Sequence, residues 1–294
     1  MILQGEELRK FQLTLLELIR EVDRVCRKNG IEYSLDGGTL LGAVRHGGFI
    51  PWDDDADIVF YRPEYRKFFK ACKKDLNLNK FFLQEHRTDP EYPWGYAKLR
   101  MNDTEFIQSG QDHLKFHKGI YIDIFIYDQV PDNYLIRRIH YAACYAVRKC
   151  QYSVVGKFYA GNPFKRWWYK QLDKIPKKLL FAVLNFMASK TNGEKYSRDK
   201  VSGRKKVSAP TKRTELVRHM TYPYQRKVAK YGLPRVAFDG YMDYEFEGAK
   251  FRIIENYDAY MSVLYGNYMQ MPPVEKRVGH LEVESIKYDR CTRI

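Results

Sequence analysis

The sequence predicts an α+β fold, in which helices are interspersed with short strands. Apolar residues recur at helical spacing from Glu6 to Lys28, and Asn29-Gly30 then supplies a stop signal. Residues 56–60 and 119–125 are short runs of the kind that form strands. Residues 134–190 return to helical spacing, now with many basic residues. The 294 residues are enough for one large domain or two smaller ones.

Each further element follows from local spacing and from its stop signals. Pro63 stands in the first turn of an expected helix, where proline is tolerated, and Gly266 ends another. Up to residue 133 we expect a strand at 31–35, helices at 39–45 and 63–74, and strands at 56–60, 81–86, 96–100 and 119–125. Beyond it we expect helices at 134–158 and within 163–190, a loop at 192–210, short strands between 222 and 254, and a helix at 256–265.

Between Gly37 and Asp57 a glycine turn precedes a run of carboxylates. Gly37 and Gly38 would let the backbone approach a phosphate closely. Thr39 could cap the helix that follows, whose free N–H groups favour an anion. The sequence therefore indicates a phosphate-binding turn at this point.

Asp53, Asp55 and Asp57 are two residues apart, so on an extended chain they point to the same side, while Asp54 points to the other. Asp55 and Asp57 could hold a divalent cation, with Asp53 as a further ligand or a supporting residue. Carboxylate oxygens suit Mg²⁺ or Mn²⁺. An EF-hand is excluded because its glycine and distal glutamate are missing. A solvated acidic turn is the alternative.

Asp123 is a lone carboxylate in an apolar, alternating strand. Ile120, Ile122 and Ile124 would share one face of this strand, and Asp123 would lie on the other. A carboxylate in such a place is either satisfied by local hydrogen bonds or serves chemistry. In the second case Asp123 would be a third metal ligand, or a base, beside Asp55 and Asp57.

The positive charge is concentrated in one segment. Between Tyr134 and Lys230 there are 24 Lys or Arg and four Asp or Glu, a net of +20 in a chain of net +15. Such segregation predicts a polyanionic partner. Basic helices that contain Trp167 and Trp168 could lie on an anionic membrane. The alternative is a helical subdomain whose apolar face is core.

Five scattered cysteines form no C-x-x-C pair, so neither a disulfide framework nor a zinc site is indicated, and a reducing compartment fits best. The N-terminus does not have the pattern of a signal peptide, and no apolar stretch approaches 18 residues. We expect a cytoplasmic protein that is peripheral on the inner face of the cytoplasmic membrane.

The segment from Asp36 to Asp57 resembles the LicD family, which includes bacterial phosphocholine transferases and is related to fukutin and fukutin-related protein. The first block is DGGTLLGAVRHGGFIPWDDDAD. Further matches are Lys98, the run GIYIDIF that contains Asp123, and the tail YGNYMQMPP followed by Lys276, Arg277 and His280. Between Tyr134 and Gly240 the resemblance is weak, and a proline that family members often carry after the Asp123 strand is replaced.

The resemblance implies a nucleotidyltransferase-like fold: a mixed sheet with flanking helices. Because the character of the sequence changes at Tyr134, we expect a nucleotidyltransferase-like catalytic core at 1–133, a basic helical insertion at 134–221 and a C-terminal part that packs on the core at 222–294. The resemblance also implies transfer of phosphocholine, or a similar phosphorylated group, from a CDP-linked donor. The acceptor would be a hydroxyl of a cell-surface or lipid-linked glycan, such as lipopolysaccharide or teichoic acid.

Two other functions stay open: a nucleotidyltransferase that acts on RNA or on a small molecule, and a binding protein that has lost catalysis. No RNA-binding signature is present, which disfavours nucleic acid, and the intact aspartates disfavour the binding protein.

The remaining candidate residues would recognise the donor. Arg45, His46 and Lys98 are candidate phosphate partners, although each could equally form a surface ion pair. A choline group needs aromatic faces because a quaternary ammonium cannot donate hydrogen bonds. Trp52 and then Trp94 are the candidates for this cage, with Tyr92 and Tyr96 close in sequence.

Overall fold

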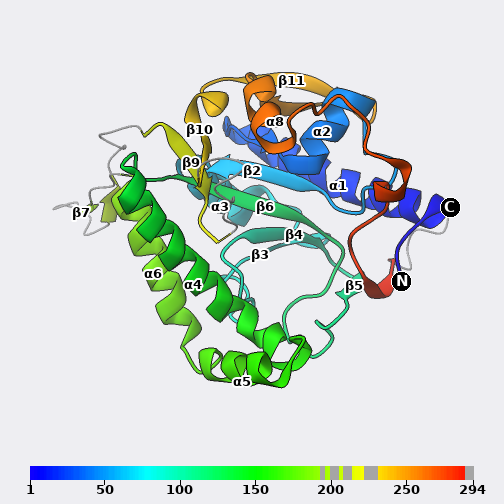
Figure 1. Cartoon of the computed structure of the whole chain (residues 1–294). Coiled ribbons are helices and arrows are strands. Elements are labelled where there is room, and N and C mark those ends of the chain that lie inside the picture. Colours follow the sequence, from blue (N-terminus) through cyan, green and yellow to red (C-terminus); the bar gives the residue numbers. More distant parts are fainter. Residues whose placement is uncertain (193–195, 199–204, 208–213, 222–230, 289–294) are drawn as a thin grey trace. The chain divides into compact units, whose positions relative to one another are not determined.

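A mixed sheet with helices around it confirms the predicted α+β class. The computed structural model describes residues 1–192, 196–198, 205–207, 214–221 and 231–288. The central strand order is β1 (Ser34–Leu35), β2 (Asp57–Tyr61), β6 (Tyr121–Gln129), β4 (Ala97–Met101) and β3 (Phe81–Gln84) (Figure 1). The last residues of β6 pair with β9 (Leu216–His219), which pairs with β10 (Leu233–Pro234). The chain divides into one unit of Met1–Ile126 and Ala237–Ile294 and a second unit of Tyr127–Val236.

Helices α1 (Gly5–Asn29) and α3 (Arg62–Asp75) pack together and against the sheet of the first unit, α1 through β4 and α3 through β2. The apolar stripe of α1, which includes Leu15, Ile19 and Val22, is buried. Gly30 ends α1 in a left-handed conformation, as its sequence predicts. Burial of this stripe, rather than helix propensity alone, holds α1 in place.

Helix α2 (Gly37–His46) begins two residues earlier than predicted, so Gly37 and Gly38 lie in its first turn. Helix α8 (Tyr257–Tyr265) ends at Gly266 as predicted. Within the first unit, the strands β5 (Glu105–Gln108) and β13 (Val283–Lys287) were not predicted, and they form an antiparallel pair. In the second unit β9 was not predicted either. Short 3₁₀ turns occur at Arg235–Phe238 and Val274–Lys276.

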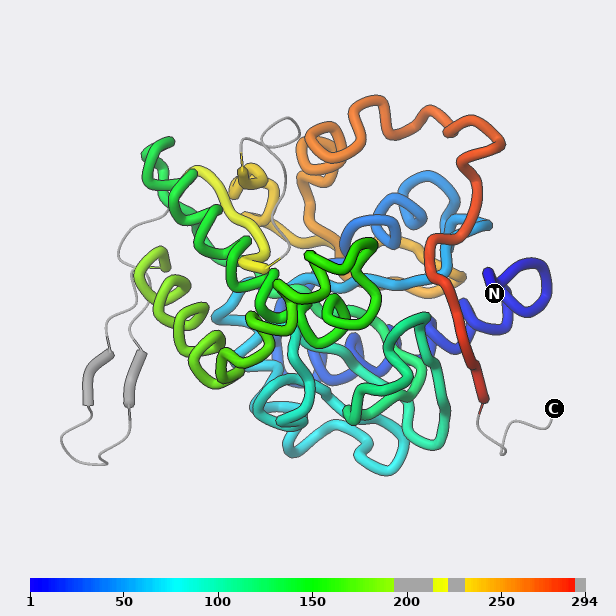
Figure 2. Tube along the Cα trace, turned by 60° about the horizontal axis from the view of Figure 1, so that its bottom comes forward, coloured from blue at the N-terminus to red at the C-terminus, as the bar shows by residue number. Residues whose placement is uncertain are grey.

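The N-terminus pairs with the start of β13 in the first unit. The Met1 ammonium donates to the Val283 carbonyl at 2.5 Å, and the Val283 N–H donates to the Met1 carbonyl at 2.9 Å. Figure 2 shows the red C-terminal strand beside the N-terminus. The C-terminal segment is thereby fixed to the unit that contains the aspartates.

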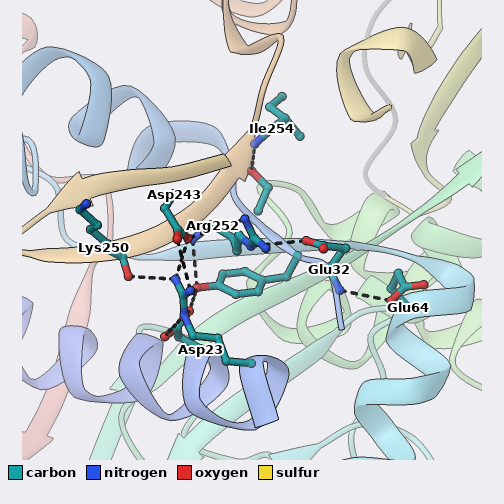
Figure 3. Close-up of polar contacts among 10 residues, drawn as sticks. Asp23, Glu32, Glu64, Asp243, Lys250, Arg252 and Ile254 are labelled. Atoms are coloured by element: carbon teal, nitrogen blue, oxygen red, sulfur yellow. Dashed lines mark hydrogen bonds and ion pairs between the residues drawn. The ribbon is translucent and has the colours of Figure 1, made fainter. Parts of the chain in front are cut away.

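A hairpin of β11 (Tyr241–Phe246) and β12 (Ala249–Ile254) is tied to α1 and β1 by polar contacts (Figure 3). Arg27 pairs with Asp23 and Asp243, each at 2.8 Å. The buried Tyr33 hydroxyl donates to Asp23 at 2.7 Å, and the Ile254 N–H donates to the Ser34 hydroxyl at 3.0 Å. The contacts from Arg27 to Asp243 and from Ile254 to Ser34 connect segments more than 200 residues apart.

The second unit is mainly helical, with α4 (Tyr134–Tyr159), α5 (Pro163–Leu172) and α6 (Lys177–Thr191). Cys144, Leu180, Phe181, Leu184 and Met220 belong to its apolar core. The predicted loop at 192–210 is wrong where β7 (Tyr196–Arg198) pairs with β8 (Lys205–Val207). Part of the predicted strand region, 222–230, lies outside the described residues. None of the helices in the described ranges combines the length and the apolar composition that a bilayer crossing requires.

His117 gives the first unit a predicted acid sensitivity. Its Nδ1 accepts the Gly119 N–H at 3.1 Å, its Nε2 lies 3.1 Å from the Asn102 amide oxygen, and its ring stacks on Phe82. Burial, followed by the positive charge of Arg100, lowers the pKa of His117 to about 4. The unfolded chain binds this proton near pH 6.5, so the stabilisation is present above pH 6.5 and is lost as the pH falls to about 4.

We therefore expect His117→Gln to flatten the fall in melting temperature between pH 6.5 and 4, because the variant has no imidazole to protonate. His113→Gln is the control, since His113 is an exposed histidine whose ring lies 3.6 Å from Asp112. Melting curves across this range check the prediction. An unchanged pH slope in His117→Gln would show that this imidazole does not contribute.

Candidate active site

Neighbouring strands bring Asp57 and Asp123 together. Asp57 is the first residue of β2, and Asp123 lies in β6, the next strand in the sheet. The Asp123 N–H donates to the Ala56 carbonyl at 2.9 Å, which fixes the register of the two segments. The isoleucines on the other face of β6 are buried, as predicted, and Asp123 is only partly exposed. The two aspartates are thus placed by backbone pairing.

The loop that carries Asp53 and Asp55 is held by a side chain of α1. The buried Gln12 amide donates to the carbonyls of Ile50 at 3.2 Å and Asp53 at 3.0 Å. The Asp53 N–H closes a turn by donating to the Ile50 carbonyl at 2.9 Å. No sequence pattern singled out Gln12, because a glutamine in an amphipathic helix usually faces solvent.

Crowding of the carboxylates raises their pKa values. For Asp53 the causes are burial and then the charge of Asp55. For Asp57 they are burial and then the charges of Asp55 and Asp123. Burial also raises the pKa of Asp123, against the opposing effect of Lys98. The Asp53 Oδ2 atom is buried and has no hydrogen-bond partner among the described residues.

Lys98 faces Asp123 across the strand pair. The two residues are register partners on β4 and β6, and the Lys98 ammonium lies 2.5 Å from Asp123 Oδ1. The ammonium also lies over the Tyr121 ring, 3.3 Å from its centroid. Burial lowers the pKa of Lys98 to about 8, and the charge of Asp123 opposes this. Lys98 therefore contacts a carboxylate in this structure, rather than standing free for a phosphate.

Gly37 and Gly38 lie against the carboxylates. Gly37 has φ +51°, and a Cβ atom there would lie 3.1 Å from Asp57 Oδ2. A Cβ atom on Gly38 would lie 2.9 Å from Asp53 Oδ2. Any side chain at either position would press on the aspartates, so the close approach requires glycine.

Thr39 has a different role from the predicted cap. The residue before α2 is Asp36, and its side chain makes no capping bond to the helix. The Asp36 carboxylate instead accepts a hydrogen bond from the buried Tyr260 hydroxyl. The Thr39 hydroxyl accepts the Asp57 N–H at 2.9 Å. Thr39 therefore fixes the start of β2, since it sits inside the helix rather than at its entrance.

His280 is a site residue whose contacts no spacing rule could have revealed. Its ring nitrogens lie 3.0 Å from Asp54 Oδ1 and 3.1 Å from Asp55 Oδ2. Hydrogen bonds to Asp54 and then Asp55 raise the pKa of His280 to about 11. One ligand atom each from Asp53, Asp54 and His280 lie within 4.8 Å of one another. The C-terminal segment thus reaches the aspartate loop.

Asp54 anchors that segment. Its buried carboxylate accepts the N–H groups of His280 at 3.2 Å and Leu281 at 2.9 Å. Although burial acts in the opposite direction, these bonds and the His280 ring hold the pKa of Asp54 below its usual value. A Cβ atom on Gly279 would lie 2.4 Å from Asp54 Oδ2, so glycine is needed for this approach.

Arg45, His46 and Trp52 form a second group of predicted residues. Arg45 donates to the Tyr268 carbonyl at 2.9 Å, while its buried Nε has no partner among the described residues. His46 meets the edge of the Trp52 ring, with centroids 6.3 Å apart. The Arg277 guanidinium lies 5.6 Å from the centroid of the same ring. A cation of the protein itself therefore faces Trp52.

Trp94 belongs to a separate aromatic group. Its ring packs edge-on to Tyr92 and Phe116, with centroids 5.3 Å away in each case. Tyr92 in turn contacts Tyr96, over whose ring Lys98 lies at 5.4 Å. This aromatic group is therefore connected to the Lys98–Asp123 pair, and the partly exposed Trp94 lies within it.

The segment that contains these residues is similar in sequence to known proteins. Residues 30–143 match the family model described as "LicD/FKTN/FKRP, nucleotidyltransferase domain", a range that contains all the predicted aspartates. The chain is similar to "Lipopolysaccharide cholinephosphotransferase LicD" of Haemophilus influenzae, with 29% identity over 93% of this chain and 95% of that protein. It is also similar to "Ribitol 5-phosphate transferase FKRP" of Homo sapiens and Mus musculus, with 51% identity over 16% of this chain and 10% of those proteins.

The resemblance seen in the sequence is confirmed by the match over residues 30–143 and by the similarity that extends along nearly the whole chain. The chain contains a nucleotidyltransferase domain of the LicD/FKTN/FKRP family at residues 30–143.

Proposed function

We propose that the chain transfers phosphocholine from CDP-choline to a hydroxyl of a cell-surface glycan, such as lipopolysaccharide or a teichoic-acid precursor. The similarity to known proteins indicates a LicD-family transferase that moves phosphorylated groups onto glycans. The similarity to the Haemophilus influenzae protein over nearly the full length supports the finer proposal. The observation that carries it is the placement of Asp57 and Asp123 on adjacent strands, where the charges of Asp53, Asp55 and Asp123 all act on Asp57.

These residues suit a divalent cation. All are oxygen ligands, three of them have raised pKa values through burial and mutual repulsion, and Asp53 Oδ2 is buried without a partner among the described residues. We propose that Asp55 and Asp57, with Asp53 and Asp123, hold Mg²⁺ or Mn²⁺. When bound, this ion would offset the charge of the donor diphosphate as its bond to CMP breaks.

The chain's own residues would position the two substrates. Gly37 and Gly38 let the carboxylates lie against the N-terminal turn of α2, whose backbone N–H groups would face a phosphate held at the carboxylates. Arg45, in the last turn of the same helix, is the candidate charge partner. A new bond forms between the phosphocholine phosphorus and the glycan oxygen, and CMP leaves. The proton of the glycan hydroxyl must be removed in this step.

Asp123 is our candidate for the base that accepts this proton. Lys98 holds its Oδ1 atom, which orients the carboxylate, and its raised pKa favours proton uptake. The alternative role is a shared oxygen ligand for the cation. In that case the cation would keep Asp123 ionised and unable to act as a base.

Choline recognition is assigned to Trp94. The face of Trp52 already has the Arg277 guanidinium near it, whereas Trp94 lies with Tyr92 and Phe116 in an aromatic group. A quaternary ammonium binds to such ring faces. This favours Trp94 over Trp52, although Trp52 was the first candidate from the sequence.

Ribitol phosphate is the second candidate group, because the chain matches part of the ribitol 5-phosphate transferases. The test is to incubate the protein with Mg²⁺, a glycan acceptor and CDP-choline, CDP-ribitol, CTP or ATP in turn. Our proposal expects consumption of CDP-choline with release of CMP. Consumption of CDP-ribitol would show that the transferred group is ribitol phosphate rather than phosphocholine. Consumption of CTP or ATP with release of diphosphate would support a nucleotidyltransferase instead.

The first prediction from this proposal is that Asp55→Asn or Asp57→Asn removes nearly all transfer, with little change in melting temperature. Loss of a residue that only supports a metal ligand already lowers affinity for the cation about 10- to 100-fold, so loss of a charged ligand should lower it at least as much. Transfer rates across a Mg²⁺ titration are the measurement. Asp103→Asn is the control, because Asp103 is exposed at φ +58°, a conformation that asparagine also adopts. Full turnover at low Mg²⁺ in either site variant would contradict the assignment.

Asp123→Asn should also lose most activity, because its carboxylate would serve either the cation or the proton. Rate and melting temperature are measured on the same samples. If Asp123 is the base, Asp123→Asn should leave the affinity for Mn²⁺ nearly unchanged. If Asp123 is a metal ligand, the same substitution should lower that affinity. If the rate per folded molecule stays near wild type while the melting temperature falls, Asp123 is structural.

Trp94→Leu should raise the KM for CDP-choline about 2- to 30-fold, the range expected for loss of one cation–π contact. The change in kcat should be smaller, because the ring binds the headgroup and not the reacting phosphate. Trp52→Leu is the matched variant. A larger effect in Trp52→Leu than in Trp94→Leu would reverse our choice between the two rings.

A further inference from the structure

Helix α5 presents an aromatic stripe that the described part of the chain leaves exposed. Phe164, Trp167 and Trp168 are spaced i, i+3 and i+4, so they share one face of the helix. Their exposed fractions are 72%, 53% and 51%, and no residue of α5 is buried. Phe158 and Tyr159, at the end of α4 just before α5, are also exposed. Large exposed aromatic patches of this kind mark interaction sites.

The other face of α5 is firmly attached to α4. Gly156 of α4 lies so close to Tyr169 that a Cβ atom would come within 2.6 Å of the ring. The Lys149 ammonium lies 3.4 Å from the Tyr169 hydroxyl. Lys157 pairs with Asp173, which follows α5, at 2.6 Å. Since α5 is held from one side, its aromatic stripe is a fixed feature of the second unit, and Figure 1 shows α5 crossing one end of the α4 and α6 pair.

The charged residues near the stripe favour an anionic partner. Lys165, Arg166 and Lys170 are exposed on α5, and no acidic residue occurs in this helix. The surrounding segment from Tyr134 to Lys230 has a net charge of +20. A helix with aromatic residues on one face and cations beside them lies in the interface of an anionic bilayer, with its rings at the headgroup level.

We infer that α5 docks the protein on an anionic membrane by inserting Phe164, Trp167 and Trp168 among the lipid headgroups. Lys165 and Lys170, which flank the stripe on its two sides, pair with lipid phosphates at the same time. Docking in this way is independent of the donor and of the reaction, because none of these residues belongs to the aspartate site. It would bring the enzyme to a surface where a lipid-linked acceptor is available.

Vesicle sedimentation tests the docking directly. The full chain is mixed with vesicles of phosphatidylcholine alone or of phosphatidylcholine with phosphatidylglycerol. We expect binding to the anionic vesicles only, with a decline as salt shortens the Debye length to about 10 Å at 0.1 M and below this at higher salt. Equal binding to both kinds of vesicle, or binding to neither, would overturn the inference.

Charge reversal with a matched control locates the surface. Lys165→Glu with Lys170→Glu should weaken vesicle affinity more than about tenfold, since each cation near an anionic surface contributes about a factor of five. The helix should persist, because Lys165→Glu places a glutamate three residues after the Asn162 cap, which accepts the Lys165 N–H at 2.8 Å. Lys70→Glu with Lys74→Glu on α3 makes the same change of charge elsewhere. Equal losses in the two double variants would contradict docking through α5.

The aromatic residues are tested by fluorescence, because α5 holds two of the four tryptophans. Brominated lipids should quench the wild-type emission and should quench it much less in Trp167→Ala with Trp168→Ala. Circular dichroism of the variants checks that the helices remain. Tighter binding to a single-stranded RNA than to vesicles, or a concentration-dependent dimer lost in the same variants, would assign the surface to a different partner and refute membrane docking.

Discussion

The repulsion among the carboxylates at the junction of β2 and β6 is the constraint on which the site depends. Asp57 and Asp123 are brought together by the bond from the Asp123 N–H to the Ala56 carbonyl, and Asp53 and Asp55 approach from the preceding loop. Among the described residues, cations relieve this repulsion at its edges, through Lys98 on Asp123 and His280 on Asp55. The fold therefore holds together negative charges that would separate in a free chain, which is the arrangement that a divalent cation stabilises.

The aspartates could be singled out as candidates from the sequence because their signal is local. A lone polar residue in an apolar strand is visible without tertiary information. The spacing of two was a weaker guide, because Asp53 and Asp55 lie in a loop before β2. The expectation that Asp54 points away from Asp55 is wrong, since both contact the His280 ring. Local signals also define α1, through its stripe and glycine stop, and the end of α8 at Gly266. By contrast, β13 pairs with β5 across more than 170 residues, and neither strand has a long apolar run to reveal it.

The contacts of the site were less predictable than its members. The sequence predicts that Thr39 caps the helix. The helix starts at Gly37, however, so the Thr39 hydroxyl accepts a hydrogen bond from the Asp57 N–H instead. Lys98 reads as a phosphate partner, but the antiparallel register of β4 and β6 sets it opposite Asp123. The contacts of His280 with Asp54 and Asp55 depend on the path of the C-terminal segment, which nothing in the spacing of the chain specifies. Register and long-range chain path are tertiary properties.

We propose that the four carboxylates form one divalent-cation site, and Mn²⁺ binding followed by electron paramagnetic resonance tests this most directly. We expect wild-type protein to remove the signal of free Mn²⁺ at one saturable site, Mg²⁺ to compete for that site, and Asp57→Asn to abolish the binding. If the protein binds no Mn²⁺, or if Asp57→Asn binds Mn²⁺ as tightly as wild type, the four carboxylates do not form a divalent-cation site.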